Sequence, residues 1–209
     1  VIPYYNKFVD TYPDLKSLSK ASLDELMMLW SGLGYYRRIK NIYLAAQIIS
    51  RKYDNKFPRD YEDILSLPGI GRTTASAIST FSGYSHRAIL DGNVKRILRR
   101  YFKISYENNS KTEKILWEKS IFVTPLKKTS QFIQAMMDIG SLVCTRSKPN
   151  CMMCPLKELK CLYTEDEQKI SKNKKNIKKI NMYLLTLINS LDEVYLEKIK
   201  SGMLWENLY

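Results

Sequence analysis

The chain has 209 residues, with 34 Lys and Arg against 21 Asp and Glu, and its formal net charge is +13. Hydrophobic residues make up 44% of it, which excludes a disordered chain and allows one domain, or one domain and the start of a second. The charge favours a polyanionic partner such as nucleic acid, because each neutralised phosphate releases condensed counterions. A basic but otherwise ordinary surface is the alternative, and charge alone leaves both open.

No apolar run is long enough to span a bilayer, so no membrane partner is expected. The first residues do not resemble a signal peptide, which predicts a cytoplasmic protein, associated with the nucleoid if its source is bacterial. The sequence does not begin with Met, and it ends at 205–209 inside what reads as an ordered element. We therefore expect a fragment that is cut at both ends.

Helical patterns follow one another along most of the chain. Ser22 and Glu25 form a Ser-x-x-Glu capping box ahead of an apolar run, and two glycines at 32 and 34 end that helix. Apolar residues from Ile39 to Ile49 recur at helical spacing and predict the next helix. Further helices are predicted at 60–65, at 73–80, from about 93, at about 112–122 and at 129–142.

The composition changes after residue 166. Lysines among Asn and Ser, with little apolar content, predict a linker at 167–180. From Met182 the pattern becomes strand-like at 183–188, with a turn at 189–192 and a second short strand at 194–196. This segment predicts the opening hairpin of a second, truncated domain.

A tight glycine turn is predicted at 67–75, which reads Leu-Pro-Gly-Ile-Gly-Arg-Thr-Thr-Ala. Gly69 and Gly71 permit a turn that leaves backbone N–H groups exposed at the start of the next helix, and such groups bind anions. Ile70 is expected to point inward, and Arg72 adds positive charge. A site of this kind holds a phosphate without reading a base. An ordinary helix corner with a glycine cap is the alternative.

Aromatic and basic residues stand beside glycines at 31–38, which reads Ser-Gly-Leu-Gly-Tyr-Tyr-Arg-Arg. A tip of this composition can insert a ring into a base stack while arginines hold the backbone. The alternative is that Tyr35 and Tyr36 are core aromatics that follow a helix end.

An acidic residue stands in the string Ile-Leu-Asp-Gly-Asn-Val-Lys-Arg at 89–96. Asp91 precedes a predicted helix, so the simple interpretation is an N-cap.

The four cysteines, Cys144, Cys151, Cys154 and Cys161, lie close together with the spacing C-x6-C-x2-C-x6-C. A local group in a chain of this size favours a metal centre in a reducing compartment over disulfides. Four thiolates bind either one zinc ion or a 4Fe–4S cluster. Zinc ribbons use two close pairs and only one pair is close here, but spacing alone leaves zinc open.

Together these strings resemble the helix-hairpin-helix DNA glycosylase superfamily, in particular its A/G-mismatch adenine glycosylases, over residues 1–161. The resemblance implies an all-α glycosylase core at 1–166, with the helix-hairpin-helix at about 62–80 and a cluster loop at 144–161. After the linker, the string Ser-Gly-Met-Leu-Trp-Glu-Asn-Leu-Tyr resembles the start of the family's α+β Nudix-like domain, which is expected at 181–209.

The resemblance also implies residue roles. Asp91 matches the essential aspartate, which stabilises positive charge on the sugar while the N-glycosidic bond breaks. The family's proton-donating glutamate has no match in this chain, so the fragment is expected to be inactive alone. Thr73 stands where relatives that also cut the backbone carry a Schiff-base lysine, which implies a hydrolase only.

The same resemblance makes Tyr35 the wedge residue and the four cysteines the ligands of one 4Fe–4S cluster. The family pattern has five residues between the last two cysteines and this chain has six, which leaves Cys161 the ligand most in doubt. The residues expected to contact DNA are Tyr35, Arg37, Leu67, Gly69, Gly71, Arg72, Thr73, Arg146 and Lys148.

The function that follows is a base-excision-repair glycosylase, monomeric, which acts on double-stranded DNA and removes adenine mispaired with guanine or 8-oxoguanine. Two alternatives remain open. One is an endonuclease III-like glycosylase and lyase, which Thr73 and the Gly-Leu-Gly-Tyr-Tyr string disfavour. The other is a non-catalytic DNA-binding module with a structural zinc.

Overall fold

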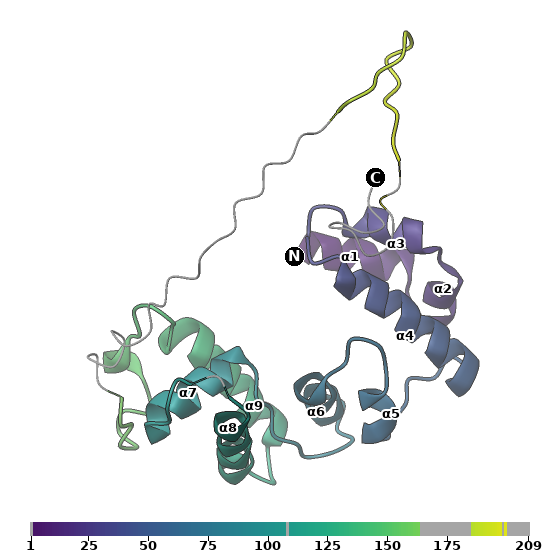
Figure 1. Ribbon diagram of the computed structural model, residues 1–209. Helices are drawn as coiled ribbons and strands as arrows, with labels where there is room; N and C mark the ends of the chain where they lie inside the picture. The colour runs from purple at the N-terminus through teal and green to yellow at the C-terminus, as the bar shows by residue number, and fades with distance from the viewer. Residues whose placement is uncertain (1, 108, 164–184, 198, 200–209) are drawn as a thin grey trace. The chain divides into compact units, whose positions relative to one another are not determined.

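The computed structural model describes residues 2–107, 109–163, 185–197 and 199. The chain divides into two compact units, Val1–Ile170 and Ser171–Tyr209, and each is described by itself. All regular structure in the described part of the first unit is helical (Figure 1). Its elements are α1 (Ile2–Thr11), α2 (Leu15–Lys20), α3 (Leu23–Trp30), α4 (Arg37–Tyr53), α5 (Tyr61–Leu65), α6 (Arg72–Phe81), α7 (Gly92–Phe102), α8 (Ser110–Val123), α9 (Thr129–Asp138), η1 (Ile139–Val143) and η2 (Cys151–Met153).

The predicted capping box at the start of α3 is confirmed. The Glu25 backbone N–H donates to Ser22 Oγ over 3.2 Å, and the Ser22 N–H donates to the Glu25 carboxylate over 2.7 Å. Both bonds satisfy donors that a helix start leaves unpaired. The hydrogen bonds from the Ser22 backbone and hydroxyl hold the pKa of Glu25 below its ordinary value.

Helices α1 to α4 share one hydrophobic core and form a group of their own in Figure 1. Ala21, Leu26, Met27 and Ile39 are buried at its centre, and Phe8 and Trp30 pack around them. Helix α4 crosses both α2 and α3. This core supports the loop between α3 and α4.

A second core forms where α7 packs against α8 and α9. Its buried residues are Ile89, Leu90, Val94, Ile97, Leu98, Leu116, Ile133 and Met136. Helix α6 reaches this core through Ala77 and contacts α9. Helix α6 therefore joins the second core, and α5 packs against α6.

The helix predicted at 129–142 differs from the observed one in its last turn. Helix α9 ends at Asp138, and a π-helical turn, η1, continues to Val143. Gly140 in this turn lies so close to the first turn of α7 that a Cβ on it would stand 2.5 Å from Asn93 Cβ. A side chain there would force η1 and α7 apart, so this close contact requires glycine.

The described part of the second unit contains one antiparallel bridge, between Ile188 and Val194. The Asn189 side chain closes the turn by accepting the N–H groups of Leu191 and Glu193 at 2.9 and 3.0 Å. The turn and bridge lie where a hairpin is predicted. The linker at 167–180 lies outside the described residues, as do most residues on which the expectation of a Nudix-like domain rests.

Candidate functional site

The hairpin between α5 and α6 exposes backbone N–H groups. The Ile70 N–H donates to the Leu67 carbonyl over 3.1 Å and closes the turn, with Leu67 buried and Ile70 half-buried. Gly69 has a φ of +78°, and its Cα lies against the Asn41 side chain of α4, which leaves no space for a Cβ. Gly71 is the N-cap of α6 and no side chain caps that helix. The first N–H groups of α6 can therefore bind an anion.

An ion pair and a hydrogen bond tie the hairpin to the end of α4. Asp63 of α5 accepts the Tyr53 hydroxyl over 2.7 Å and the Lys52 ammonium over 3.3 Å. The hydrogen bond from Tyr53, and then that from Lys52, hold the pKa of Asp63 below its ordinary value. The hairpin is thus held against α4 by Asp63 on α5 as well as by the Asn41–Gly69 contact.

Arg72 and Thr73 occupy the first turn of α6. Thr73 is half-buried. Arg72 is exposed, and its guanidinium lies 3.8 Å from the ring centroid of Trp117 on α8. No sequence pattern predicted this contact, because the two residues lie on different helices that are far apart in the chain.

The loop between α3 and α4 presents Tyr35 to solvent. Gly34 has a φ of +69° and Tyr35 itself a φ of +50°, a left-handed conformation that few non-glycine residues adopt. The Trp30 indole N–H donates to the Gly34 carbonyl over 2.9 Å and holds the loop on the first core. Tyr35 is 77% exposed, with the Arg38 guanidinium 4.8 Å from its ring centroid. Tyr36 packs on the core, so the alternative that both tyrosines are core residues is wrong for Tyr35.

Asp91 caps α7, as the simple interpretation predicts. Its Oδ1 accepts the Val94 N–H over 2.8 Å. Ala88, Ile89 and Leu90 are buried immediately before it, so the carboxylate is held half-buried at the edge of the second core. Among the residues that the structure describes, Oδ2 has no hydrogen-bond partner. The hydrogen bond at Oδ1 therefore orients the carboxylate and leaves Oδ2 without a hydrogen bond to the described residues.

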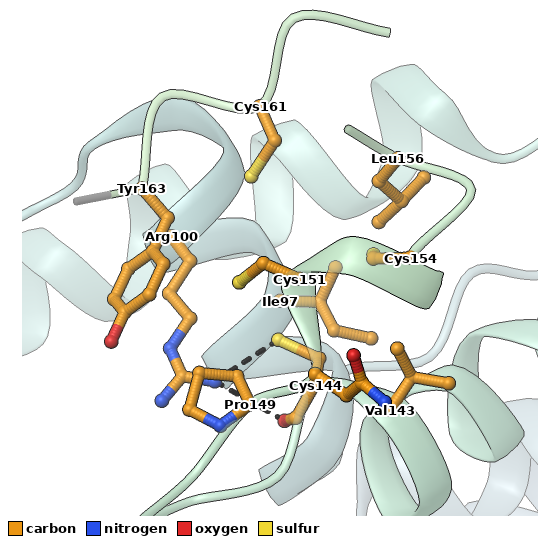
Figure 2. A pocket seen from close by; sticks show the side chains of 11 residues that line it. Ile97, Arg100, Val143, Cys144, Pro149, Cys151, Cys154, Leu156, Cys161 and Tyr163 are labelled. Carbon is orange, nitrogen blue, oxygen red and sulfur yellow. Dashed lines mark hydrogen bonds between the residues drawn. The ribbon is translucent and has the colours of Figure 1, made fainter. Parts of the chain in front are cut away.

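The four cysteines line one cavity, which Figure 2 shows with Arg100 on one side of it and Tyr163 beside Arg100. All four are free thiols. In the described part of the chain, no three Cys, His, Asp or Glu side chains are grouped closely enough to hold one metal ion. Burial raises the pKa of Cys151 and of Cys161, and the neighbouring cysteines raise both further.

The last cysteine reaches the cavity in spite of the extra residue before it. Lys160 adopts a left-handed φ of +61°, and its N–H donates to the Lys157 carbonyl over 3.2 Å. The Cys161 N–H then donates to the Leu156 carbonyl over 3.3 Å. The additional residue is absorbed in this turn, so Cys161 lines the same cavity as the other three.

Two arginines of α7 hold the chain on both sides of Cys144. Arg96 donates from Nε to the Cys144 carbonyl over 2.7 Å and from Nη2 to the Gly140 carbonyl. Arg100 is 3% exposed and donates to Sγ of Cys144 over 3.1 Å and to the carbonyl of Thr145 over 2.8 Å. Sequence reasoning missed this role of Arg100, although its place three residues after buried Ile97 on α7 was a signal.

The basic residues expected to contact DNA lie on exposed segments. Arg37 is exposed in the first turn of α4, and Arg146 and Lys148 are exposed in the cysteine loop. The Thr145 hydroxyl donates to the Lys148 carbonyl over 2.6 Å and shapes that loop. The structure thus brings the four cysteines to one cavity and Gly71, Arg72 and Thr73 to one helix start. No hydrogen bond among the described residues joins Tyr35 to either group.

The chain is similar to known DNA repair proteins. A model of the "HhH-GPD superfamily base excision DNA repair protein" family matches residues 1–120. The adenine DNA glycosylase of Buchnera aphidicola subsp. Baizongia pistaciae (strain Bp) is 42% identical over 212 residues, covering 100% of this chain and 60% of that protein. The adenine DNA glycosylase of Homo sapiens is 35% identical over 161 residues, covering 76% of this chain and 30% of that protein. The chain spans about 60% of the length of the bacterial relatives that it matches throughout.

Solved structures agree with the helical fold. The structure of a thermostable thymine-DNA glycosylase has a TM-score of 0.70 at 30% sequence identity, covering 78% of this chain and 76% of that chain. A non-covalent endonuclease III–DNA complex has a TM-score of 0.68 at 21% sequence identity, covering 80% of this chain and 77% of that chain. At this identity the similarity concerns the fold alone. The predicted all-α helix-hairpin-helix fold is confirmed. No helix in the described part of the chain combines the length and the apolar character needed to cross a membrane.

Proposed function

The chain belongs to the HhH-GPD superfamily of base excision DNA repair proteins, and on this premise we propose that it is the core of a glycosylase. The proposed enzyme hydrolyses the N-glycosidic bond that joins adenine to the DNA sugar. The proposed substrate is double-stranded DNA in which adenine is mispaired with guanine or 8-oxoguanine, bound by a monomer. Relatives named adenine DNA glycosylase support this over the whole chain. The single structural observation that carries the chemistry is the half-buried Asp91 carboxylate, which is oriented by the hydrogen bond to its Oδ1.

Asp91 has the chemistry that breaking an N-glycosidic bond needs. As the bond to the base breaks, positive charge develops on the sugar, and an adjacent carboxylate stabilises it or bonds to it briefly. The bond between Oδ1 and the Val94 N–H fixes the carboxylate before the substrate arrives. A charge that is already oriented stabilises the transition state without further reorganisation. Water then completes the hydrolysis at the sugar carbon.

The residue at position 73 supports hydrolysis without strand cleavage. A lyase needs an amine that forms an imine with the opened sugar, and the Thr73 hydroxyl cannot do so. Thr73 lies in the same helix turn as the exposed N–H groups of α6. We propose that this turn holds a backbone phosphate and carries no covalent chemistry.

Tyr35 is proposed as the residue that fills the space left by the extruded base. A glycosylase turns its target base out of the duplex, and an aromatic ring can occupy the gap. The left-handed backbone and the 77% exposure of Tyr35 support this role. Arg37 and Arg38 follow in the first turn of α4 and are exposed, so they are proposed to contact the DNA backbone.

The cysteines are proposed to hold one 4Fe–4S cluster, which would fix the loop that carries Arg146 and Lys148. All four line one cavity, which fits a group that binds four thiolates. A single zinc ion needs its sulfurs roughly 3.8 Å apart, since each Zn–S bond is about 2.3 Å. Zinc ribbons use two close pairs of cysteines, whereas only Cys151 and Cys154 are a close pair here, which supports the cluster.

The proposal is tested by an excision assay with the full-length protein that contains this chain. Duplexes with adenine opposite 8-oxoguanine, guanine or thymine are incubated with excess enzyme, and strand breaks are measured before and after alkali. We expect breaks only after alkali, and only for adenine opposite guanine or 8-oxoguanine. Breaks without alkali, or excision of a damaged pyrimidine instead, would replace the proposal with the lyase alternative.

A further inference from the structure

The Arg72 guanidinium stacks on an aromatic side chain from another part of the fold. Its central carbon lies 3.8 Å from the ring centroid of Trp117. Trp117 belongs to α8 and also packs against the second hydrophobic core. The indole therefore joins the core to the guanidinium and bridges α8 to the first turn of the hairpin helix α6.

This stack orients the guanidinium without using its hydrogen-bond donors. Stacking engages the flat face of the group, and its five N–H donors lie in the plane and point outward. In the described residues no carboxylate forms an ion pair with Arg72. Arg72 is exposed and is the first residue of α6, the helix whose first N–H groups have no side-chain cap.

We propose that Trp117 is a positioning residue of the DNA interface, which holds Arg72 ready for the phosphate that the α6 amides bind. The proposal rests on the proposed function, since it takes the hairpin as the phosphate site. A flexible arginine loses side-chain entropy when it binds a phosphate. Stacking removes much of that freedom before DNA arrives, which strengthens the phosphate contact.

The sequence offers variants that separate this role from simple packing. Trp117→Phe keeps an aromatic face, whereas Trp117→Leu keeps an apolar side chain and removes the face. Arg72→Ala removes the cation. Lys119 is a charge-matched control, because it lies two residues further along α8, on the opposite face from Trp117, and stacks on Phe102.

The experiment is a double-mutant cycle measured with full-length protein and an undamaged duplex at several salt concentrations. We expect Trp117→Leu and Arg72→Ala each to weaken binding about 3- to 10-fold and to lower the salt slope by about 0.9, the value for one lost phosphate contact. The double variant should be no weaker than the weaker single variant. Trp117→Phe should retain most of the affinity. Lys119→Ala also removes one positive charge, but its affinity should depend on salt concentration as that of the wild type does.

Thermal unfolding of each variant identifies a purely structural effect. If Trp117→Leu lowers the melting temperature but leaves the affinity and the salt slope unchanged, Trp117 only packs and the proposal is wrong. Independent, multiplicative losses in the cycle would also overturn it. If the wild type itself fails to bind the duplex, the proposed function fails as well. If the wild type binds the duplex but the cycle shows no coupling between Trp117 and Arg72, the positioning role of Trp117 is wrong and the proposed function stands.

Discussion

Nη1 of Arg100 lies 3.1 Å from Sγ of Cys144 and donates a hydrogen bond to it. Arg100 is almost completely buried, yet no carboxylate among the described residues pairs with it. Burial lowers the pKa of Arg100, but the hydrogen bond and the charge at Cys144 more than offset this, and the net direction is upward. A buried cation is unfavourable unless anions or carbonyls surround it. The Cys144 sulfur and the Thr145 and Arg146 carbonyls supply those partners, so Arg100 is held by the cysteine loop and holds it in turn.

Arg100→Met should weaken the cysteine loop and lower the iron content of the purified protein. The substitution keeps apolar volume but leaves the Thr145 and Arg146 carbonyls without their donor, and each buried unpaired group costs about 1–3 kcal/mol. Iron per chain and the melting temperature measure the effect. Arg99→Met, on the neighbouring position of α7, is the control and should retain its iron. Equal iron in both variants would contradict the role of Arg100.

The purified protein should contain iron and sulfide, and should absorb visible light. The four cysteines line one cavity, and four thiolates are the ligand set of a 4Fe–4S cluster. Metal analysis after anaerobic purification checks this. Substituting Cys161 by Ser should lower iron retention, because Cys161 lines the cavity in spite of the extra residue before it. Stoichiometric zinc without visible absorption would show that the module is a zinc site.

Asp91→Asn should lower the rate of adenine excision on the order of 10²-fold or more, because it removes a preorganised charge beside a developing cation. Asparagine also caps helices well, so the melting temperature should stay near that of the wild type. Asp91→Ala removes both charge and cap and should also cost about 1 kcal/mol of stability. Single-turnover excision and thermal unfolding separate the two effects. Near-normal turnover of Asp91→Asn would leave Asp91 as a helix cap only.

Thr73→Lys should allow the protein to be trapped covalently on DNA. A lysine amine in the first turn of α6 can attack the sugar after the base has left and form an imine that borohydride reduces. The measurement is a protein–DNA adduct on a denaturing gel, with Thr74→Lys as the control on the exposed neighbouring position. Efficient trapping by the wild type would instead indicate a lyase.

The hydrogen bonds of Asp63 with Tyr53 and Lys52, which join the hairpin to α4, predict that folding stability depends on pH. Because the folded-state pKa of Asp63 is lowered, its contribution to stability is present above the unfolded pKa, about 3.9. That contribution is lost as the pH falls through the lower folded-state value. Tyr53→Phe removes the largest cause and should move the Asp63 pKa upward toward its ordinary value. Carboxyl NMR titration checks this, and an unchanged pKa in Tyr53→Phe would contradict the assigned hydrogen bond.

Local contacts were predictable from the sequence alone. The Ser22–Glu25 capping box, the Asp91 cap and the glycine turn before α6 each depend on residues within one helix turn of each other. Their geometry follows from backbone hydrogen bonding and from the residue types that satisfy it. Motif spacing therefore sufficed to place the hairpin, the capped aspartate and the cysteine loop.

Tertiary structure alone decided which distant side chains meet. The Arg72–Trp117 stack, the Arg100–Cys144 bond and the contact of Gly140 with Asn93 join separate helices. The exposure of Tyr35 and the partial burial of Tyr36 depend likewise on where the first core ends. No period or motif encodes such contacts, because they depend on how whole helices pack and on which side chains then share the remaining space.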